Sequence, residues 1–502
     1  MSGGQILAVK KFIGPSFSVC YWPLAVFLRS VLGAFAQNLP SLAGIFKKIR
    51  FAYLQASFST TQSPFILSIM KYTPLPAELF QMNRKRFTRE MKPHTIAIFN
   101  ANDQMPRSGD QFHPFRQNAG LYYLSGIDQE ETMLVLFPDC PREKFQELLL
   151  IKRTSEHIAI WEGHKYTKEE AAAASGIEKV LFLDEAEQIL NELILLSMGI
   201  YLNLNENDRY LSDVATRDMR YAHRIRERYP AHTVYRAQPI LKKLQSVKSK
   251  REVAATQHCI DITGKAFQRV LEFVRPGVWE YEIEAEIIHE FIRNRATGHG
   301  YSPIIGSGKN ACVLHYVDNN QQCQAGDVIL MDFGCEYANY NADLSRSIPV
   351  SGTFSDRQRA VYNAVHRVLN EARAMLVPGN TLEEYHKEVG KIMESELLGL
   401  GLISRSDVEN QDPEKPAYKK YFMHGTSHHL GLDVHDLNLR YEPFRAGMLF
   451  TCEPGIYIPE ESLGIRLENN ILITDHGPLD MFKDIPIEAE EIEELMHAGA
   501  MA

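Results

Sequence analysis

Asp332 and Asp343 lie on the two arms of a predicted β-hairpin, where paired carboxylates could hold a cation. The apolar run 328–331 predicts a buried strand that ends on Asp332, and a second strand carries Asp343 back. Gly334 and the segment 337–340 can form the turn. A charge at the end of an apolar strand is costly to desolvate, and two like charges repel each other. Something positive is therefore expected between them, although a lone pair of aspartates is more often a solvated turn.

Three later segments add histidines and acids of the kind that bind hard metal ions. Residues 422–436 contain four histidines and two aspartates around a glycine-flanked turn. Glu453 ends an apolar strand before a Pro-Gly turn, and Glu468 lies on a strand with Arg466 on the same face by two-residue alternation. Each fragment alone has an ordinary structural explanation. Five candidate ligands at apolar strand ends in one domain are much harder to explain in that way.

The region that precedes these segments, from 70 to 238, has the pattern of an α/β domain. Short apolar strands alternate there with helices, and the basic stretch 217–228 is expected to lead into a linker. The strands are predicted at 95–99, 132–137 and 200–204, and the helices at 168–174 and 185–197.

The second region, 239–502, repeats one arrangement. Two helices joined by Pro-Gly are followed by strand pairs, and the same order then recurs. We interpret this layout as an internal pseudo-twofold repeat around a central sheet, so that a site between the halves draws ligands from both. The helices are predicted at 250–274, 281–294, 356–376 and 382–398.

The composition narrows the class of protein. A chain of 502 residues predicts two or three domains, and 45% hydrophobic with 23% charged residues is ordinary for a globular protein. The formal charge of −9 argues against nucleic acid or an anionic membrane as partner. The seven cysteines form no CxxC pair, which favours reduced thiols in a cytosol-like compartment. No later segment is long and apolar enough to span a bilayer, so no stable membrane association is expected.

The amino terminus is basic and free of acids. Residues 1–77 contain seven lysines and arginines but no aspartate or glutamate. A signal peptide, an organellar presequence, or an extension over 1–69 without a fold of its own are the three interpretations. We favour the extension, because mixed-charge sequence begins at Glu78, soon after Met70. The expected location is then the cytoplasm, with an organelle or export as the alternative if 1–69 is a targeting segment.

Taken together, the motifs resemble the pita-bread metallopeptidases, in the branch of the Xaa-Pro aminopeptidases (aminopeptidase P) and prolidases. The resemblance covers residues 70 to about 497 and implies a creatinase-like amino-terminal α/β domain followed by a pita-bread catalytic domain. It also implies two divalent metal ions, usually manganese. The matching motifs, in order, are DFGCEYANYNADLSR at 332–346, HGTSHHLGLDVHD at 424–436, TCEPGIY at 451–457 and GIRLEN at 464–469.

The resemblance implies a role for each candidate ligand. Asp332 would chelate one ion, and Asp343 would bridge both. His428 and Glu453 would bind the other ion, and Glu468 would be the second bridge. Four carboxylates and one imidazole suit manganese or magnesium-like ions, because no thiolate is available to favour zinc. Such a pair of ions would activate water for attack on a peptide carbonyl, and Glu453 would carry the proton to the leaving nitrogen.

Five further residues match family positions around the substrate. His424 and His435 would contact the substrate and stabilise the tetrahedral intermediate. Arg466 would orient the bridging acids. His315 matches a histidine that lines the pocket, and Tyr457 is expected to bind substrate.

The amino-terminal region also carries family motifs, at 110–118 and 122–126. Asp110 falls where the acid of a neighbouring subunit reaches the active site in tetrameric members, so a homodimer or homotetramer is expected. His164 stands where the best-known bacterial members carry arginine, which leaves open how the peptide beyond proline is held.

The leading hypothesis is an Xaa-Pro aminopeptidase that releases the first residue from peptides with proline in second position. A prolidase restricted to Xaa-Pro dipeptides is the alternative with the same ligands. A non-catalytic binding protein on the same fold is a remote alternative, because such relatives lose metal ligands and all five are present here.

Overall fold

The computed structural model describes residues 71–207, 209, 213–437 and 439–500. The predicted extension over 1–69 lies outside these residues. The division at 238 and 239 stays a prediction, and the two regions are described in turn.

The amino-terminal region contains a six-stranded mixed sheet in the order β6-β5-β4-β1-β7-β8. Strand β1 runs antiparallel to β4 and parallel to β7. The predicted strands and helices are present as β1, β4, β7, α6 and α7, and the predicted α/β character is confirmed. The strands are β1 (Thr95–Asn100), β4 (Met133–Leu136), β5 (Glu147–Ile151), β6 (Val180–Phe182), β7 (Gly199–Leu202) and β8 (Thr233–Arg236), with a small hairpin of β2 (Pro106–Ser108) and β3 (Gln111–Phe112). The helices are α3 (Ala77–Glu90), α4 (Ala119–Ser125), α5 (Glu156–Glu162), α6 (Lys168–Ser175), α7 (Glu187–Leu196), α8 (Arg217–Arg228) and α9 (Gln238–Gln245).

Both faces of this sheet are covered. Successive strand residues point to opposite faces, and in β1 Ile96 and Ile98 join one apolar cluster whereas Ala97 and Phe99 join another. The first cluster also contains residues of α7 and α8, and the second contains residues of α3 and α4. A strand that is buried on both faces has a continuous run of apolar residues. Strand β1 could therefore be predicted from the sequence.

The expectation that the basic stretch 217–228 leads into a linker is wrong, because this stretch is helix α8 and strand β8 of the same sheet follows it. Tyr221, Ala222 and Ile225 are buried on one side of the helix, and arginines occupy many of the neighbouring positions in the sequence. Spacings of three and four residues place these side chains on one face. Because so many residues of this stretch are charged, its short amphipathic pattern was not recognised in the sequence.

The carboxy-terminal region begins with a helix pair and a group of strands. Helices α10 and α11 contact each other and pack on strands β9, β10, β12 and β13. Ser249 caps α10, and the Glu252 side chain accepts from the Ser249 backbone N–H in return, which defines the start of the helix. The elements are α10 (Lys250–Phe273), α11 (Glu280–Arg293), β9 (Gly298–His299), β10 (Ile304–Ser307), β11 (Val328–Phe333), β12 (Cys335–Tyr337), β13 (Tyr340–Asn341) and β14 (Leu344–Pro349).

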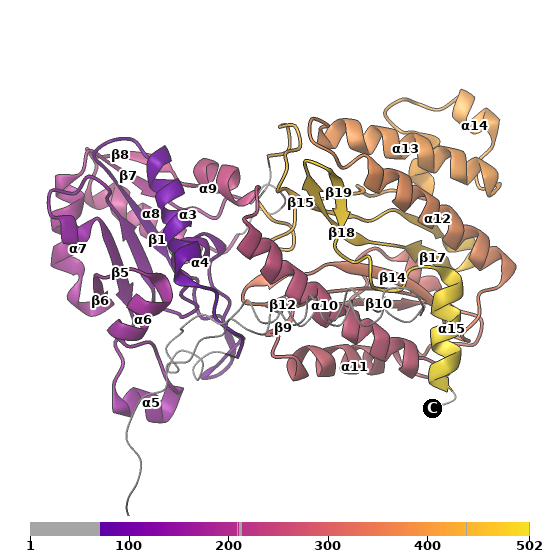
Figure 1. Cartoon of the computed structure of the whole chain (residues 1–502), viewed down its shortest axis with the longest axis horizontal. Helices are drawn as coiled ribbons and strands as arrows, with labels where there is room; N and C mark the ends of the chain where they lie inside the picture. The colour runs from indigo at the N-terminus through magenta and orange to yellow at the C-terminus, as the bar shows by residue number, and fades with distance from the viewer. Residues whose placement is uncertain (1–70, 208, 210–212, 438, 501–502) are drawn as a thin grey trace, which may run out of the picture. The chain divides into compact units, whose positions relative to one another are not determined.

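The same order of elements follows a second time. Helices α12 and α13 pack together, and α12 contacts the strands that come after them. Figure 1 shows α10 and α11 on one side of the strands and α12 and α13 on the other. The predicted recurrence of helix pair and strands is therefore present. The elements are α12 (Asp356–Ala374), α13 (Leu382–Gly399), α14 (Arg405–Glu409), β15 (Leu449–Cys452), β16 (Gly455–Ile458), β17 (Leu463–Arg466), β18 (Asn469–Thr474), β19 (Gly477–Asp480) and α15 (Ala489–Ala500).

The predicted hairpin is built from four strands. In β11, Asp332 pairs with Ser345 of β14, and Asp343 immediately precedes β14. The chain turns at Ala338 and Asn339, which both have positive φ, between β12 and β13. The hairpin therefore brings the two aspartates to the same end of the β11–β14 ladder.

Gly334 has a different role from a turn residue, because it allows a close approach of the backbone. A Cβ at this position would lie 1.8 Å from the carbonyl oxygen of Ala342. No side chain fits there unless the two arms move apart.

In the described part of the chain, no helix combines the length and the apolar content needed to cross a membrane.

We expect Gly334→Ala to destabilise the protein, since the added methyl group overlaps the Ala342 carbonyl. Overpacking of this kind lowers the free energy of unfolding by about 1–3 kcal/mol. The urea midpoint should fall for this variant and not for Gly399→Ala, where no atom lies within 4 Å of the added Cβ. Equal midpoints for Gly334→Ala and the wild type would contradict the close approach.

Candidate metal centre

The two hairpin aspartates are joined by a phenol. The hydroxyl of Tyr301 lies 2.5 Å from Oδ1 of Asp332 and is also within hydrogen-bond distance of Oδ1 of Asp343. A phenol carries one proton, so it can donate to only one of these carboxylates at a time. The sequence contained no signal for Tyr301, because it precedes β10 and lies far from the acidic motifs along the chain.

His428 faces the acids with one ring nitrogen. Its Nδ1 lies 2.9 Å from the carbonyl oxygen of His429, which can only accept, so Nδ1 carries the proton. The other nitrogen, Nε2, lies 3.5 Å from Oδ2 of Asp343 and 3.6 Å from Oε1 of Glu453. Burial opposes protonation of this ring, but Asp343 and Glu453 raise the pKa of His428. An imidazole fixed in this way by a backbone carbonyl is oriented as a metal ligand.

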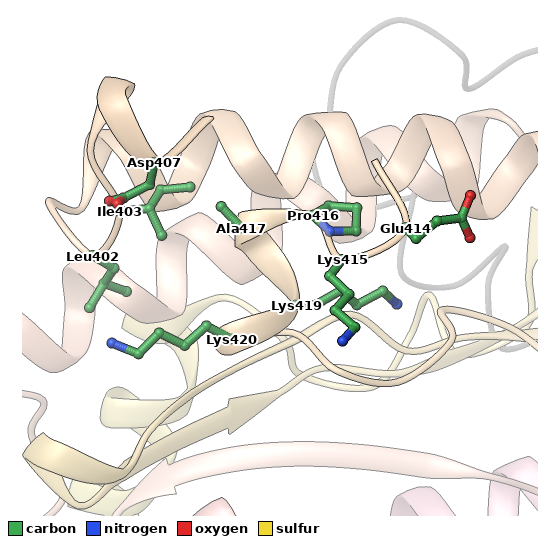
Figure 2. Close-up of a pocket in the computed structure, with 9 residues that line it drawn as sticks. All are labelled: Leu402, Ile403, Asp407, Glu414, Lys415, Pro416, Ala417, Lys419 and Lys420. Carbon is green, nitrogen blue, oxygen red and sulfur yellow. The ribbon is translucent and has the colours of Figure 1, made fainter. Parts of the chain in front are cut away.

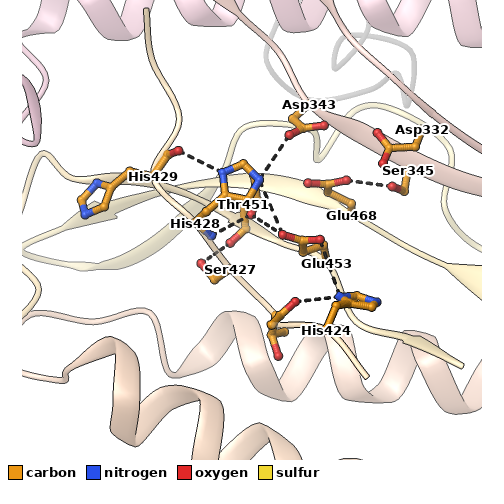
Figure 3. Close-up of polar contacts among 12 residues, drawn as sticks. Asp332, Asp343, Ser345, His424, Ser427, His428, His429, Thr451, Glu453 and Glu468 are labelled. Carbon is orange, nitrogen blue, oxygen red and sulfur yellow. Dashed lines mark hydrogen bonds and ion pairs between the residues drawn. The ribbon is translucent and has the colours of Figure 1, made fainter. Parts of the chain in front are cut away.

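Asp343, His428 and Glu468 form a compact group. Each offers one ligand atom, and these atoms all lie within 4.8 Å of one another. Figure 3 shows these side chains and that of Glu453 directed toward a common space. The geometry and the hard donor set fit a divalent cation.

The two glutamates are held by different strands. The Glu453 backbone N–H donates to the Thr426 carbonyl at 2.9 Å, and Thr451 Oγ1 donates to Glu453 Oε1 at 3.2 Å. Ser345 Oγ donates to Glu468 Oε2 at 2.7 Å. Ser345 and Thr451 carried no functional signal in the sequence, since hydroxyl residues are common in strands.

Burial and mutual repulsion raise the pKa values of these acids. Burial raises the pKa of Glu453 to about 7, helped by Asp343 and Asp332 and opposed by His428. The pKa of Glu468 is raised well above its usual value by burial and by the charges of Asp343, Glu453 and Asp332. Without a cation, the folded protein therefore holds protons on acids that are ionised in the unfolded chain.

Arg466 balances part of this charge. Its Nη2 donates to Asp332 Oδ2 at 2.6 Å, and its Nη1 donates to the Tyr457 hydroxyl at 3.0 Å. The sequence predicted that Arg466 shares a strand face with Glu468 and orients the bridging acids. In the structure, the ion pair of Arg466 is with Asp332.

Two histidines expected around the substrate lie next to the proposed ligands, with His424 Nδ1 3.8 Å from Glu453 Oε2. Nε2 of His424 is 2.8 Å from the Tyr457 hydroxyl, and the His435 ring centroid is 4.5 Å from that of His428. Burial lowers the pKa of both His424 and His435 to about 3, so both rings are neutral. His315 is exposed and lies close enough to influence both rings electrostatically.

Two residues of the amino-terminal region are not brought to this group. Asp110 is exposed at the turn between β2 and β3, where its Oδ1 accepts a hydrogen bond from Nε2 of Gln111. His164 is also exposed, and its Nε2 lies 2.8 Å from Glu170.

A separate pocket of about 620 Å³ lies along α14 and the segment before β15, and contains none of the predicted site residues. Figure 2 shows lysine side chains at its edge. It offers no acid–histidine group comparable to Asp343, His428 and Glu468, and we assign the chemistry to that group. The pocket is lined by Leu402, Ile403, Asp407, Glu414, Lys415, Pro416, Ala417, Lys419 and Lys420.

We expect the metal-depleted protein to lose stability as the pH rises from about 4.5 to about 7. The folded-state pKa of Glu453 is about 7 and its usual value is 4.5. Between these pH values the Glu453 carboxyl is protonated in the folded protein and ionised in the unfolded chain, so a rise in pH favours unfolding. The loss is on the order of 3 kcal/mol. Urea midpoints of the metal-depleted protein at pH 5 and pH 7.5 measure it.

Glu453→Gln is the matched variant, because it keeps the size of the side chain and cannot titrate. Its metal-depleted form should show a smaller change between the two pH values. An identical change in both proteins would contradict the raised pKa.

Comparisons with known proteins identify the family of this chain. The profile of metallopeptidase family M24 matches residues 254–475, and that of the aminopeptidase P N-terminal domain matches residues 80–201. The chain is 34% identical over 438 residues to the Xaa-Pro aminopeptidase of Escherichia coli (strain K12), covering 84% of this chain and 98% of that protein.

Solved structures of aminopeptidase P share the fold. Zinc-substituted E. coli aminopeptidase P in complex with product has a TM-score of 0.76 at 31% identity, covering 85% of this chain and 99% of that one. Proline aminopeptidase P II from Yersinia pestis also has a TM-score of 0.76 at 31% identity, covering 84% and 100%. The expected pita-bread catalytic domain behind an amino-terminal α/β domain is confirmed. The chain therefore belongs to metallopeptidase family M24, with the domain arrangement of aminopeptidase P.

Proposed function

We propose that this protein is a dinuclear metal-dependent Xaa-Pro aminopeptidase that releases the first residue from peptides with proline in second position. The observation that supports this most directly is the buried group of Asp343, His428 and Glu468, with Asp332 and Glu453 beside it.

In this proposal each ligand keeps the role that its motif implies. Asp332 would hold one ion, His428 and Glu453 would hold the other, and Asp343 and Glu468 would contribute to both. The one nitrogen and many oxygen donors favour manganese. When bound, the two ions supply Lewis acidity and make water nucleophilic at neutral pH.

The residues of the chain position the substrate and move the proton. In this proposal Glu453 takes up a proton and delivers it to the leaving nitrogen. The one proton of the neutral His424 ring lies on Nδ1, which donates to the Gly425 carbonyl at 2.7 Å, so in this proposal His424 contacts the substrate while the neutral ring of His435 donates to a developing oxyanion. Arg466 and Tyr457 hold Asp332 and His424 in place through direct hydrogen bonds.

Proline explains why such a site is useful. An Xaa-Pro bond has no N–H and a fixed φ, so a peptidase that binds its substrate as a paired strand loses a hydrogen bond there. A site that holds the amino terminus and activates water directly does not need that N–H.

Further parts of the proposal concern assembly and location. The exposed Asp110 is available to a second copy of the chain, which suits a homodimer or homotetramer with shared sites. The cysteines of the described ranges are free, which suits the cytoplasm. No nucleic-acid or membrane partner is proposed.

The manganese-loaded protein should release the first residue from Xaa-Pro-Xaa tripeptides, because the proposed site needs a free amino terminus and a proline ring but no carboxyl terminus directly after it. Chromatography of the products from matched Xaa-Pro-Xaa and Xaa-Pro substrates measures this. A strict preference for the dipeptide would reject the aminopeptidase assignment in favour of a prolidase. Metal binding without turnover of either substrate would favour a binding protein.

Asp343→Ala should remove bound metal and lower kcat/KM by more than about 100-fold, since even residues that only support metal ligands contribute 10–100-fold. Elemental analysis and tripeptide turnover check the two effects together. Asp475→Ala, on an exposed turn, is the control. Full turnover by a metal-free preparation of Asp343→Ala would count against the mechanism.

A further inference from the structure

The segment 424–428 carries two site histidines and is fixed on its inner side by β15. Ser427 Oγ donates to the Thr451 carbonyl at 2.6 Å, and the His428 backbone N–H donates to Thr451 Oγ1 at 3.1 Å. The Thr426 carbonyl accepts from the backbone N–H of Glu453 at 2.9 Å. One short segment thus connects the backbones of the two residues proposed to bind the same ion, His428 and Glu453.

The outer side of this segment is held by a histidine of helix α13. The backbone N–H of Thr426 donates to Nδ1 of His386 at 3.2 Å. The His386 ring also lies against Gly425, since a Cβ at Gly425 would be 3.3 Å from Cε1 of His386. Thr426 is only 1% exposed, so its N–H cannot turn to water instead.

The hydrogen bond requires a neutral His386 ring. An acceptor at Nδ1 places the proton on Nε2. Burial, together with the positive charges of Lys419, Arg440 and Arg209, lowers the pKa of His386 to about 4. The acceptor is therefore present throughout the neutral range.

We propose that His386 is a positioning residue of the metal centre, because its Nδ1 holds the Thr426 N–H and so fixes the segment from which His428 and Glu453 reach the metal. No sequence motif included His386, which lies on a helix some forty residues before the segment it supports. The kinetic part of this inference rests on the proposed peptidase function, whereas the metal-binding part does not.

Three substitutions separate the acceptor from the shape of the ring. H386N places an amide oxygen where Nδ1 lies, H386Q places it where Nε2 lies, and H386F keeps the ring without an acceptor. Histidine, asparagine and phenylalanine have similar helix propensities, so the helix itself is little affected. K387N, at an exposed neighbouring position, is the matched control.

The measurement is calorimetric titration of Mn²⁺ into the metal-depleted full chain, with far-UV circular dichroism to verify folding. H386F should bind Mn²⁺ 10–100-fold more weakly, as expected for loss of a group that orients ligands. H386N and K387N should bind close to the wild-type affinity, and H386Q should resemble H386F. With a tripeptide substrate, kcat should follow the same order while KM changes less.

Unchanged Mn²⁺ affinity in H386F, or equal losses in H386N and H386F, would overturn the proposal. If H386F does not fold, the comparison of H386N with H386Q decides, and equal affinities in these two would overturn it. If the wild type binds Mn²⁺ but cleaves no peptide, the proposed function fails, and the affinities still test His386.

Discussion

The repulsion between buried carboxylates is the constraint to which much of the catalytic domain responds. Four acids that are separated along the chain lie around one common space, as Figure 3 shows: Asp332, Asp343, Glu453 and Glu468. One guanidinium, that of Arg466, forms an ion pair with one of them. This one ion pair cannot neutralise four acids in a medium of low dielectric constant, so protons or metal ions must supply most of the remaining positive charge.

The backbone holds these acids together against their repulsion. Arg346 is fully buried and uses its guanidinium to bind the backbone, donating to the carbonyls of Ser345 and Glu468 at 2.9 and 2.7 Å. Thr451 joins β15 to the histidine segment. These contacts hold the proposed ligands in position without a bound ion. Metal binding therefore does not have to order the segments that carry them.

Much of the fold was predictable because local patterns encode it. The apolar runs of β1 and β11 and the capped helices α10 and α12 follow from periodicity and end signals within a few residues. Helix α8 was missed because its buried side chains are few among many arginines. The hairpin was predicted, but the closeness of Gly334 to Ala342 was not, since it depends on how the two arms pack.

The sequence by itself determined which residues could serve as hard ligands and in what order along the chain. Residue type sets donor chemistry, and apolar strands that end on acids reveal unusual burial. Only the tertiary structure decided which residues support the ligands. Tyr301 between two aspartates, Arg466 on Asp332, and His386 behind Thr426 are contacts between distant segments. Such contacts depend on the packing of whole elements, which no local spacing in the chain specifies.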